Sequence, residues 1–350
     1  MPKNNNLEAI KLPMEVKFDQ PPKTTFKNNL DSIKVELLEG PTMDQLRSYL
    51  PQFILATWAP TPDANDKLSL RDRDKVIREA LEGKALPTAL ETINLTFRIS
   101  GISLQEVTHI LRHRMASFSA DCSGDKWWSD KDALVPHSIE HSNGWESGDY
   151  KYEDDFHGRY EAIVRAAKRL YCDMINSKQI SIMDARYILP RCLETFYYMR
   201  MTLKDCIAFI KQRMDKQIQP ETDNVMAYLM YIELLKRYPI MHDLIDMHAP
   251  SMFYIKMART GKATNLYFPD KDSDKFEWNE NDFIYQCERS ELNGTDSNTY
   301  NKFAQMMEQF DHAIAGLNLY SVSKLEMEYA DDDAAAAGID PIFLNKESWA

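Results

Sequence analysis

The sequence predicts an α+β fold, a mixed sheet with a large helical block, because strand patterns dominate its first third and helical patterns its middle. Apolar and polar residues alternate over Glu91–Ile99, which is typical of a half-buried strand. Further strands are expected over Ile33–Leu38 and Phe53–Trp58. From Asp154 to about Tyr238 the helical signal dominates. Strands that precede helices, rather than alternating with them, favour the α+β class.

Two helices are expected between these strands and the helical block. Charged and apolar residues follow a helical spacing from Ser69 to Glu82, and Gly83 ends the pattern. Ser103 and Glu106 form a Ser-x-x-Glu capping box that predicts the start of a second helix. Its expected apolar stripe consists of Leu104, Val107, Leu111 and Met115. The spacing therefore predicts a helix that continues through the residues after Leu111.

The helical block divides into four expected helices. They are predicted over Tyr160–Ile175, Met183–Arg200, Leu203–Gln217 and Glu221–Arg237. Pro220 falls where one helix must stop and the next begins, since proline is tolerated in a first turn but not in a helix interior.

Charge separates the chain into unequal parts. Residues 261–350 carry 18 acidic and 7 basic side chains, whereas residues 1–260 carry 36 and 35. We expect an irregular lead-in over 1–30, one domain over 31–260 and an acidic C-terminal extension over 261–350 with one amphipathic stretch, Phe303–Leu319. Because the net charge is −12, we expect no nucleic-acid partner. Residues 1–260 are close to neutral and could still carry a local basic pocket.

Length and composition bound the class of protein. A chain of 350 residues with 44% hydrophobic residues can bury a large core. We find no run of about 18 apolar residues and no apolar signal-peptide core after the polar start, so we expect a cytoplasmic protein without a membrane partner. The five cysteines are scattered and form no Cys-x-x-Cys pair. Free thiols and no metal site are therefore expected.

The densest chemical cluster is the triplet Arg112-His113-Arg114, expected at the end of the capped helix. Two guanidinium groups that flank an imidazole suit a diphosphate, because each arginine can donate two parallel hydrogen bonds to phosphate oxygens. The alternative is a basic last turn that only complements the helix dipole. The triplet alone leaves both interpretations open.

The residues that follow the triplet narrow the choice. The stretch from Arg112 to Asp125 resembles the signature of the flavin-dependent thymidylate synthases, Arg-His-Arg-x-x-Ser, then Asn, Glu and a Ser-Gly-Arg turn. Ser117 matches the serine, and Ser119 stands where the family has Asn. Asp121 aligns with the Glu if one residue is inserted, and Asp125 replaces the Arg.

The resemblance extends over about residues 50–245. Thr88 lies in a segment, Leu86 to Glu91, that looks like the family's His-x-Ser/Thr-x-x-Glu with its His replaced by Leu. Arg213, followed by Gln219-x-Glu221, resembles the family's Arg and Gln-x-Glu-Ile-Arg. The chain is thus identified as a diverged member of this family.

The resemblance implies the family's fold and chemistry. The implied reaction is reductive methylation of dUMP to dTMP at C5, with methylenetetrahydrofolate as carbon donor and NADPH as the reductant of bound FAD. The implied assembly is a homotetramer with sites shared between subunits. The FAD-binding residues it implies are Thr88, Arg112, His113, Arg114, Ser117, Ser119 and Arg213. The implied substrate-binding residues are His109, Asp121, Ser123, Asp125 and Asp223.

The departures from the family lie mainly on the substrate side. Asp223 and Phe196 stand where the family has arginines, and Thr202-Leu203-Lys204 replaces Asn-Ala-Arg. These losses leave two alternatives open: a relative that acts on another pyrimidine nucleotide such as dCMP, or a non-catalytic homologue that binds nucleotide or flavin. Asp223 also has a purely structural interpretation, because an acid in a first turn stabilises a helix N-terminus.

Overall fold

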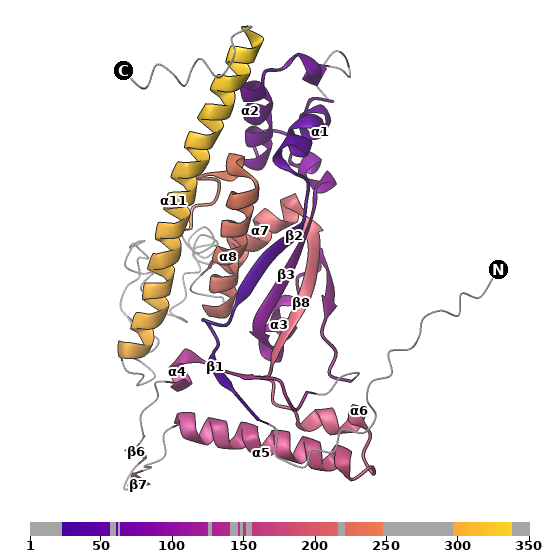
Figure 1. The fold of residues 1–350 in the computed structure, drawn as a ribbon, viewed down its shortest axis with the longest axis vertical. Helices are drawn as coiled ribbons and strands as arrows, with labels where there is room; N and C mark the ends of the chain where they lie inside the picture. Colours follow the sequence, from indigo (N-terminus) through magenta and orange to yellow (C-terminus); the bar gives the residue numbers. More distant parts are fainter. Residues whose placement is uncertain are drawn as a thin grey trace, which may run out of the picture.

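The computed structural model describes residues 23–56, 61, 64–124, 128–140, 146–147, 150–151, 156–215, 221–247 and 297–337 (Figure 1). The α+β class is confirmed. The described part contains a four-stranded antiparallel sheet in the order β2-β3-β8-β4. Its strands are β2 Lys34–Glu39, β3 Asn94–Ser103, β8 Glu194–Thr202 and β4 Ala116–Ala120.

Two short strand pairs lie outside this sheet. Strand β1, Phe26–Asn28, pairs in parallel with β5, Ala133–Val135. Strands β6, Glu146–Ser147, and β7, Tyr150–Lys151, form an antiparallel pair. Parallel and antiparallel pairing therefore both occur, but in separate sheets.

Helices of very different length surround the sheet. They are α1 Met43–Leu55, α2 Leu70–Leu81, α3 Leu104–Ile110, α4 His137–Glu140, α5 Phe156–Asn176, α6 Ile182–Ala185, α7 Leu203–Arg213, α8 Glu221–Arg237 and α11 Ser297–Ala336. Short 3-10 turns occur at η1 Ala64–Lys67, η2 Pro87–Thr92, η3 Arg186–Ile188 and η4 Pro239–Met241.

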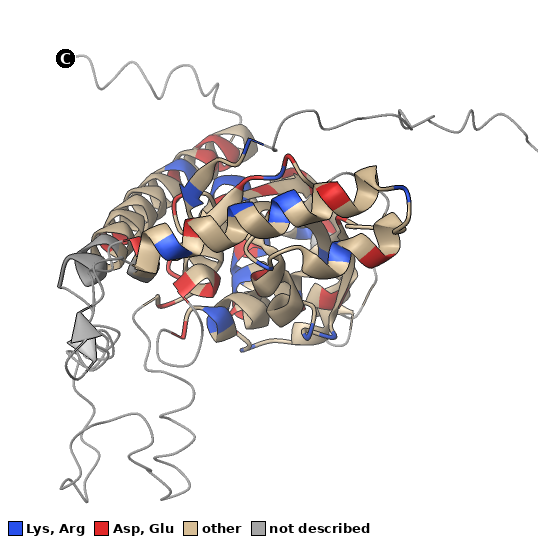
Figure 2. Cartoon of the chain, turned by 90° about the horizontal axis from the view of Figure 1, so that it is seen from below, with Lys and Arg blue, Asp and Glu red and all other residues tan. Residues whose placement is uncertain are grey.

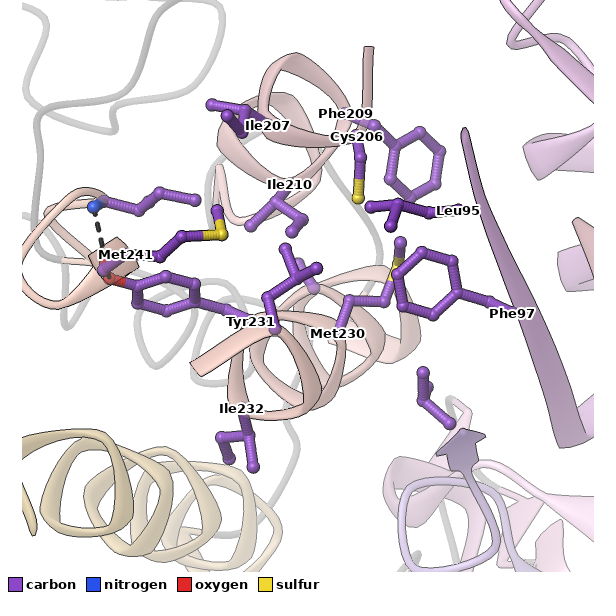
Figure 3. Close-up of a cluster of buried hydrophobic side chains, with 14 of the residues drawn as sticks. Leu95, Phe97, Cys206, Ile207, Phe209, Ile210, Met230, Tyr231, Ile232 and Met241 are labelled. Carbon is purple, nitrogen blue, oxygen red and sulfur yellow. Dashed lines mark hydrogen bonds between the residues drawn. The ribbon is translucent and has the colours of Figure 1, made fainter. Parts of the chain in front are cut away.

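One face of the sheet forms the main core. Leu95 and Phe97 of β3 are fully buried and meet side chains of α7 and α8, which also pack on each other (Figure 3). The Tyr231 hydroxyl of α8 donates to the Met241 carbonyl oxygen of η4 across 2.9 Å, which fixes the chain after α8. The opposite face of the sheet is open to solvent at Tyr198 and Arg200.

Several predicted elements are confirmed. Strand β2 lies at the Ile33–Leu38 pattern and β3 at the Glu91–Ile99 pattern. Helix α2 begins after its N-cap Ser69, and Gly83 follows it with φ +76°. The helices expected over the Tyr160, Leu203 and Glu221 patterns are α5, α7 and α8, although Gln217 and Pro220 lie outside the described residues.

The strand expected over Phe53–Trp58 is wrong. Helix α1 occupies the chain up to Leu55, and Trp58 lies outside the described residues. A capping box between Thr42 and Gln45 begins this helix. Its buried residues recur at helical spacing, namely Leu46, Leu50 and Ile54. The apolar run at Phe53 is therefore the end of a helical stripe.

The helix expected over Met183–Arg200 is also wrong. Helix α6 ends at Ala185, and β8 begins at Glu194. In β8 every second side chain is buried, including those of Tyr197, Met199 and Met201. This period of two belongs to a strand that is buried on one face. Pairing with β3 and β4 on both sides overrides the helix propensity of the methionines.

Helix α3 starts as predicted but ends early. The Ser103–Glu106 capping box is present, and α3 stops at Ile110. Leu111 and Met115 are exposed rather than part of a buried stripe. The basic triplet therefore lies in the turn between α3 and the edge strand β4, and its expected display on a helix is wrong.

Helix α11 packs along α8 and η4 and buries Phe303, Met307 and Ile314 in the main core. The amphipathic stretch predicted over Phe303–Leu319 is part of this helix. Its far end reaches α1 and α2, where the Tyr329 hydroxyl donates to Asp74 across 2.9 Å. The described part of the C-terminal extension is thus docked on the body of the protein (Figure 1).

The surface carries both signs of charge. Figure 2 shows Lys and Arg interspersed with Asp and Glu over the described helices on the face in view. Among the described helices, none has the length and apolar character needed to cross a bilayer.

Candidate functional site

Strand register brings distant parts of the predicted site to one end of the sheet. Ala116 of β4 and Leu95 of β3 both pair with Met201, on either side of β8. The basic triplet, just before Ala116, therefore lies near the level at which β3 begins. Thr88 lies in η2 just before β3 and is exposed, and η2 packs on α7. Thr88, the triplet and Ser117 therefore lie toward this end of the sheet, whereas Ser119, which pairs with Tyr198, lies farther along β4.

A buried ion-pair cluster joins α3, α7 and α8. Nη1 of Arg213 donates to Oδ2 of Asp223 across 2.7 Å, and Nδ1 of His109 lies 3.1 Å from the same oxygen. The Asp223 side chain is 1% exposed and that of Arg213 is 6% exposed. Asn224 donates to the Arg213 carbonyl oxygen across 2.8 Å, which ties the end of α7 to the start of α8. Three residues predicted from separate motifs therefore meet here.

Burial and charge oppose each other at this cluster. Burial raises the pKa of Asp223, whereas the Arg213 guanidinium and His109 favour its charged form. Burial also raises the pKa of Glu106, and the nearby Asp223 carboxylate adds to this shift. Within the described residues, Oδ1 of Asp223 is buried without a hydrogen-bond partner. The Oδ1 atom of Asp223 is therefore available to accept a hydrogen bond.

A pocket of about 320 Å³ opens beside the cluster, between α3 and the first turn of α8. This volume lies at the small end of the range for ligand sites, about 300–1,000 Å³. Its lining includes Gln105, Glu106, His109, Arg112, Thr222 and Asp223. One predicted cofactor residue, Arg112, and two predicted substrate residues, His109 and Asp223, therefore share one cavity.

His113 differs from its two neighbours in the triplet. Its ring is half-buried and meets Phe209 of α7 edge to face, with centroids 4.9 Å apart. Burial, with a contribution from the Arg213 charge, lowers the pKa of His113. The imidazole is therefore neutral near pH 7, and the positive charge of the triplet comes from its two arginines.

Arg112 and Arg114 are exposed, and no side chain in the described part of the chain pairs with either guanidinium. Ser117 and Ser119 of β4 are exposed on the adjoining edge strand. Two available guanidinium groups beside hydroxyls form a donor set that suits the anionic diphosphate of FAD. The residues present therefore fit the phosphate portion of this cofactor.

A second cluster lies at the other end of β4. The buried Asp121 carboxylate pairs with Nζ of Lys131 across 2.8 Å. This Nζ also lies 5.2 Å from the Trp128 ring and 5.6 Å from the Phe196 ring. Ser123 is half-buried nearby in the chain. Neither Asp121 nor Ser123 lines the pocket at Asp223, so the predicted substrate residues fall into two groups, and Asp125 lies outside the described residues.

Sequence reasoning missed two features of these clusters. Glu106 was identified only as a capping residue, although it also lines the pocket. Lys131 belongs to no motif, and its partner Asp121 lies ten residues away, so only the fold reveals the pair.

Comparison with known proteins agrees with the motif analysis. A family model described as "Thymidylate synthase complementing protein" matches residues 42–240. The flavin-dependent thymidylate synthase of Pyrococcus furiosus is 24% identical over 189 residues, which cover 53% of this chain and 72% of that protein. The enzyme of the same name from Clostridium tetani is 24% identical over 154 residues, 43% of this chain and 61% of that protein.

The solved structures that match part of this chain include two proteins with bound nucleotides. The UMP/dUMP methylase PolB of Streptomyces cacaoi, bound with 5-Br dUMP, is 19% identical with a TM-score of 0.49, covering 63% of this chain and 96% of that one. Thymidylate Synthase X of Helicobacter pylori, with FAD and dUMP, is 15% identical with a TM-score of 0.42, covering 57% and 93%. The family match over more than half of the chain confirms the resemblance seen in the motifs, and the chain belongs to the thymidylate synthase complementing protein family, that of the flavin-dependent thymidylate synthases.

Proposed function

We propose that this protein is a flavin-dependent methyltransferase that methylates a pyrimidine deoxynucleotide at C5, as in the conversion of dUMP to dTMP, with methylenetetrahydrofolate as carbon donor and NADPH as reductant. The observation that carries the proposal is the pair of available guanidinium groups, Arg112 and Arg114, beside a pocket lined by His109 and Asp223. An anion-binding edge next to a small polar cavity suits a cofactor and a nucleotide held side by side.

The cofactor side uses charge and hydroxyl groups. Arg112 and Arg114 bind the FAD phosphates, and Ser117, Ser119 and Thr88 supply further hydrogen bonds. When bound, FAD supplies the redox chemistry, which side chains cannot provide. His113 is half-buried and Arg213 is buried, and both position the two exposed arginines through their contacts with Phe209.

The substrate side consists of the pocket and the second cluster. His109 and Asp223 contact the pyrimidine nucleotide. Asp121 and Ser123 contribute from the other end of β4, in an assembly where one subunit completes the site of another. Asp125 contacts the nucleotide as well. We propose a homotetramer for this reason, and the sheet face exposed at Tyr198 and Arg200 leaves area for such contacts.

The same proposal extends to the organisation of the chain. Residues 31–260 form the catalytic domain, preceded by an irregular lead-in over 1–30 and followed by an acidic C-terminal extension over 261–350. The enzyme acts in the cytoplasm, within nucleotide biosynthesis.

The test combines a spectrum with a turnover assay. Purified protein incubated with FAD is expected to retain a flavin spectrum and to release tritium from C5 of a labelled pyrimidine deoxynucleotide, dUMP or dCMP, when methylenetetrahydrofolate and NADPH are present. Retention of flavin and nucleotide without tritium release from any pyrimidine nucleotide would instead support the non-catalytic alternative. Failure to retain flavin in excess FAD would overturn the proposal.

A further inference from the structure

The Asp223 carboxylate is an unusual group to find at the back of the pocket. Its side chain is 1% exposed, its Oδ2 atom accepts from Arg213, and Nδ1 of His109 lies 3.1 Å from the same oxygen. Its Oδ1 atom has no hydrogen-bond partner among the described residues. Buried carboxylate oxygens normally accept hydrogen bonds, because leaving one unsatisfied opposes folding. The unused oxygen therefore indicates a donor that arrives with a ligand.

The rest of the lining restricts what this ligand is. Glu106 adds a second acidic side chain to the pocket lining. Burial raises the pKa of Glu106, so its carboxyl group also favours a ligand with hydrogen-bonding groups. Arg112 supplies a cation to the same pocket, and its side chain reaches solvent. A ligand that matches this lining carries N–H donors at one end and a negative charge at the other. An aminopyrimidine nucleotide has both.

We propose that Asp223 makes this pocket selective for a cytidine nucleotide, with the exocyclic amine donating to Oδ1 and the phosphate directed toward Arg112. The inference rests on the proposed function for the class of substrate, a pyrimidine nucleotide. At the relevant ring position cytosine presents an N–H₂ donor, whereas uracil presents a carbonyl acceptor. A carboxylate accepts hydrogen bonds from the first and repels the second. The pocket therefore distinguishes a cytidine from a uridine nucleotide by one hydrogen bond, that between the exocyclic amine and Oδ1 of Asp223.

The ion pair with Arg213 fixes the orientation of the Asp223 carboxylate, which makes the pocket more selective. Because Arg213 donates to Oδ2, with Nδ1 of His109 beside the same oxygen, the carboxylate is held in one orientation and Oδ1 is left for the ligand. Asn224 fixes Arg213 in turn by donating to its carbonyl oxygen. Asp223 thus differs from an ordinary first-turn acid, which faces solvent at a helix N-terminus.

The first experiment varies the ligand and leaves the protein unchanged. Full-length protein saturated with FAD is titrated calorimetrically with dCMP, N4,N4-dimethyl-dCMP and dUMP. We expect dCMP to bind at least about tenfold more tightly than either of the others, since both lack the amine donor. Equal or tighter binding of dUMP or of the dimethylated nucleotide overturns the inference, as does failure of dCMP to bind at all.

The second experiment changes the carboxylate. Asp223→Asn keeps the side-chain size and is expected to weaken dCMP binding about tenfold and to narrow the gap to dUMP, because an amide offers N–H groups as well as an oxygen. Asp44→Asn on α1 is the matched control, since the Asp44 side chain is 94% exposed. Thermal melting of both variants checks folding. If Asp223→Asn folds poorly, the ligand series on wild-type protein still decides the matter.

Methyl transfer separates this inference from the proposed function. Preference for dCMP without methylation of any nucleotide would contradict the proposed function and leave the selectivity in place. Preference for dUMP, with brisk tritium release from its C5, would contradict the selectivity and leave the proposed function in place.

Discussion

The imidazole of His113 meets the Phe209 ring edge to face, with ring planes at 84° and centroids 4.9 Å apart. The guanidinium carbon of Arg213 lies 5.3 Å from the centre of the same Phe209 ring. One buried aromatic residue of α7 therefore contacts both the basic triplet and the ion-pair cluster. This contact holds the triplet in place although α3 ends before it.

Truncation of Phe209 tests this support. Phe209→Ala is expected to lower the free energy of unfolding by about 3–5 kcal/mol, the usual cost of removing a buried phenylalanine. Phe209→Leu should cost less and still reduce the flavin-to-protein ratio after purification, because the edge-to-face contact with His113 is lost. Urea unfolding and the flavin spectrum provide the measurements. A Leu variant that keeps full flavin would show that the triplet is positioned without Phe209.

Removal of either exposed arginine tests the anion-binding edge. Arg112→Ala and Arg114→Ala are each expected to weaken FAD binding by about 10- to 100-fold, as charge-assisted hydrogen bonds to phosphate contribute roughly 1.5–3 kcal/mol. Equilibrium dialysis with FAD measures the change. Arg165→Ala on α5, also an exposed arginine, is the control and should bind FAD as wild type does. Equal FAD binding by all four proteins would contradict the assignment.

Glu221 gives a prediction for pH. Burial raises the pKa of this carboxyl to about 7, and its Oε2 lies 3.0 Å from Nδ1 of His137. Because the folded-state pKa exceeds the unfolded value of about 4.5, the contribution of Glu221 to stability is fully present below about pH 4.5 and lost as pH rises through about 7. Glu221→Gln does not titrate and should avoid this loss.

Urea unfolding of both proteins at intervals from about pH 5 to about pH 8 measures the effect. The stability of wild type relative to Glu221→Gln should fall by about 1–3 kcal/mol over this interval. His137 is present in both proteins. Parallel pH profiles would contradict the raised pKa.

Two glycines with positive φ provide a matched comparison. Gly101, at the irregularity in β3, has φ +71°, and a Cβ there would lie 1.7 Å from the Ser32 carbonyl oxygen. Gly83 has φ +76°, and a Cβ there would meet nothing within 4 Å. Gly83→Ala should therefore cost only about 1–2 kcal/mol of backbone strain. Gly101→Ala should cost more than about 4 kcal/mol or prevent folding, as judged by thermal melting. Similar losses for both would contradict the close approach.

The ion pair between Arg47 and Asp74 joins α1 to α2. It is bidentate, with distances of 2.8 and 2.6 Å, and both side chains are buried. Asp74→Ala should destabilise the protein by about 3–5 kcal/mol, because it leaves the Arg47 charge without its main partner. The double variant Arg47→Met, Asp74→Leu should recover only part of this loss, because Glu328, which pairs with Arg47 across 2.7 Å, and the Tyr329 hydroxyl lose their partners. Denaturant unfolding of wild type, Asp74→Ala and the double variant measures these changes in stability. If Asp74→Ala were as stable as wild type, the ion pair would contribute little.

Sequence patterns predicted the parts of the fold that local signals determine. Ser69 and the Ser103–Glu106 box set the starts of α2 and α3 through contacts within a few residues. The end of α3 depends on distant partners instead, because His113 packs on Phe209 and Ala116 pairs with Met201. No local pattern reports such contacts. The position of the triplet in a turn, rather than on a helix, therefore could not be predicted from the sequence.

The candidate site follows the same division. Motif positions identified His109, Arg112 and Asp223, and the structure brings these three to one pocket. The partnership of Asp223 with Arg213 could not be predicted, because it depends on how the end of α7 meets the start of α8. Asp223 replaces an arginine of the family motif, and its pairing with Arg213 and its place in the pocket follow only from the fold.

The docking of α11 has a consequence for synthesis of the chain. Tyr329 bonds to Asp74, 255 residues earlier, and Asp332 accepts from the Leu70 backbone N–H, 262 residues earlier. Proteins fold from the N-terminus as they emerge from the ribosome, and contacts across long separations form late. Helix α2 therefore makes these contacts only after residues 329–332 have been synthesised. During that interval the surface that α11 later covers is exposed to chaperones, proteases and other nascent chains.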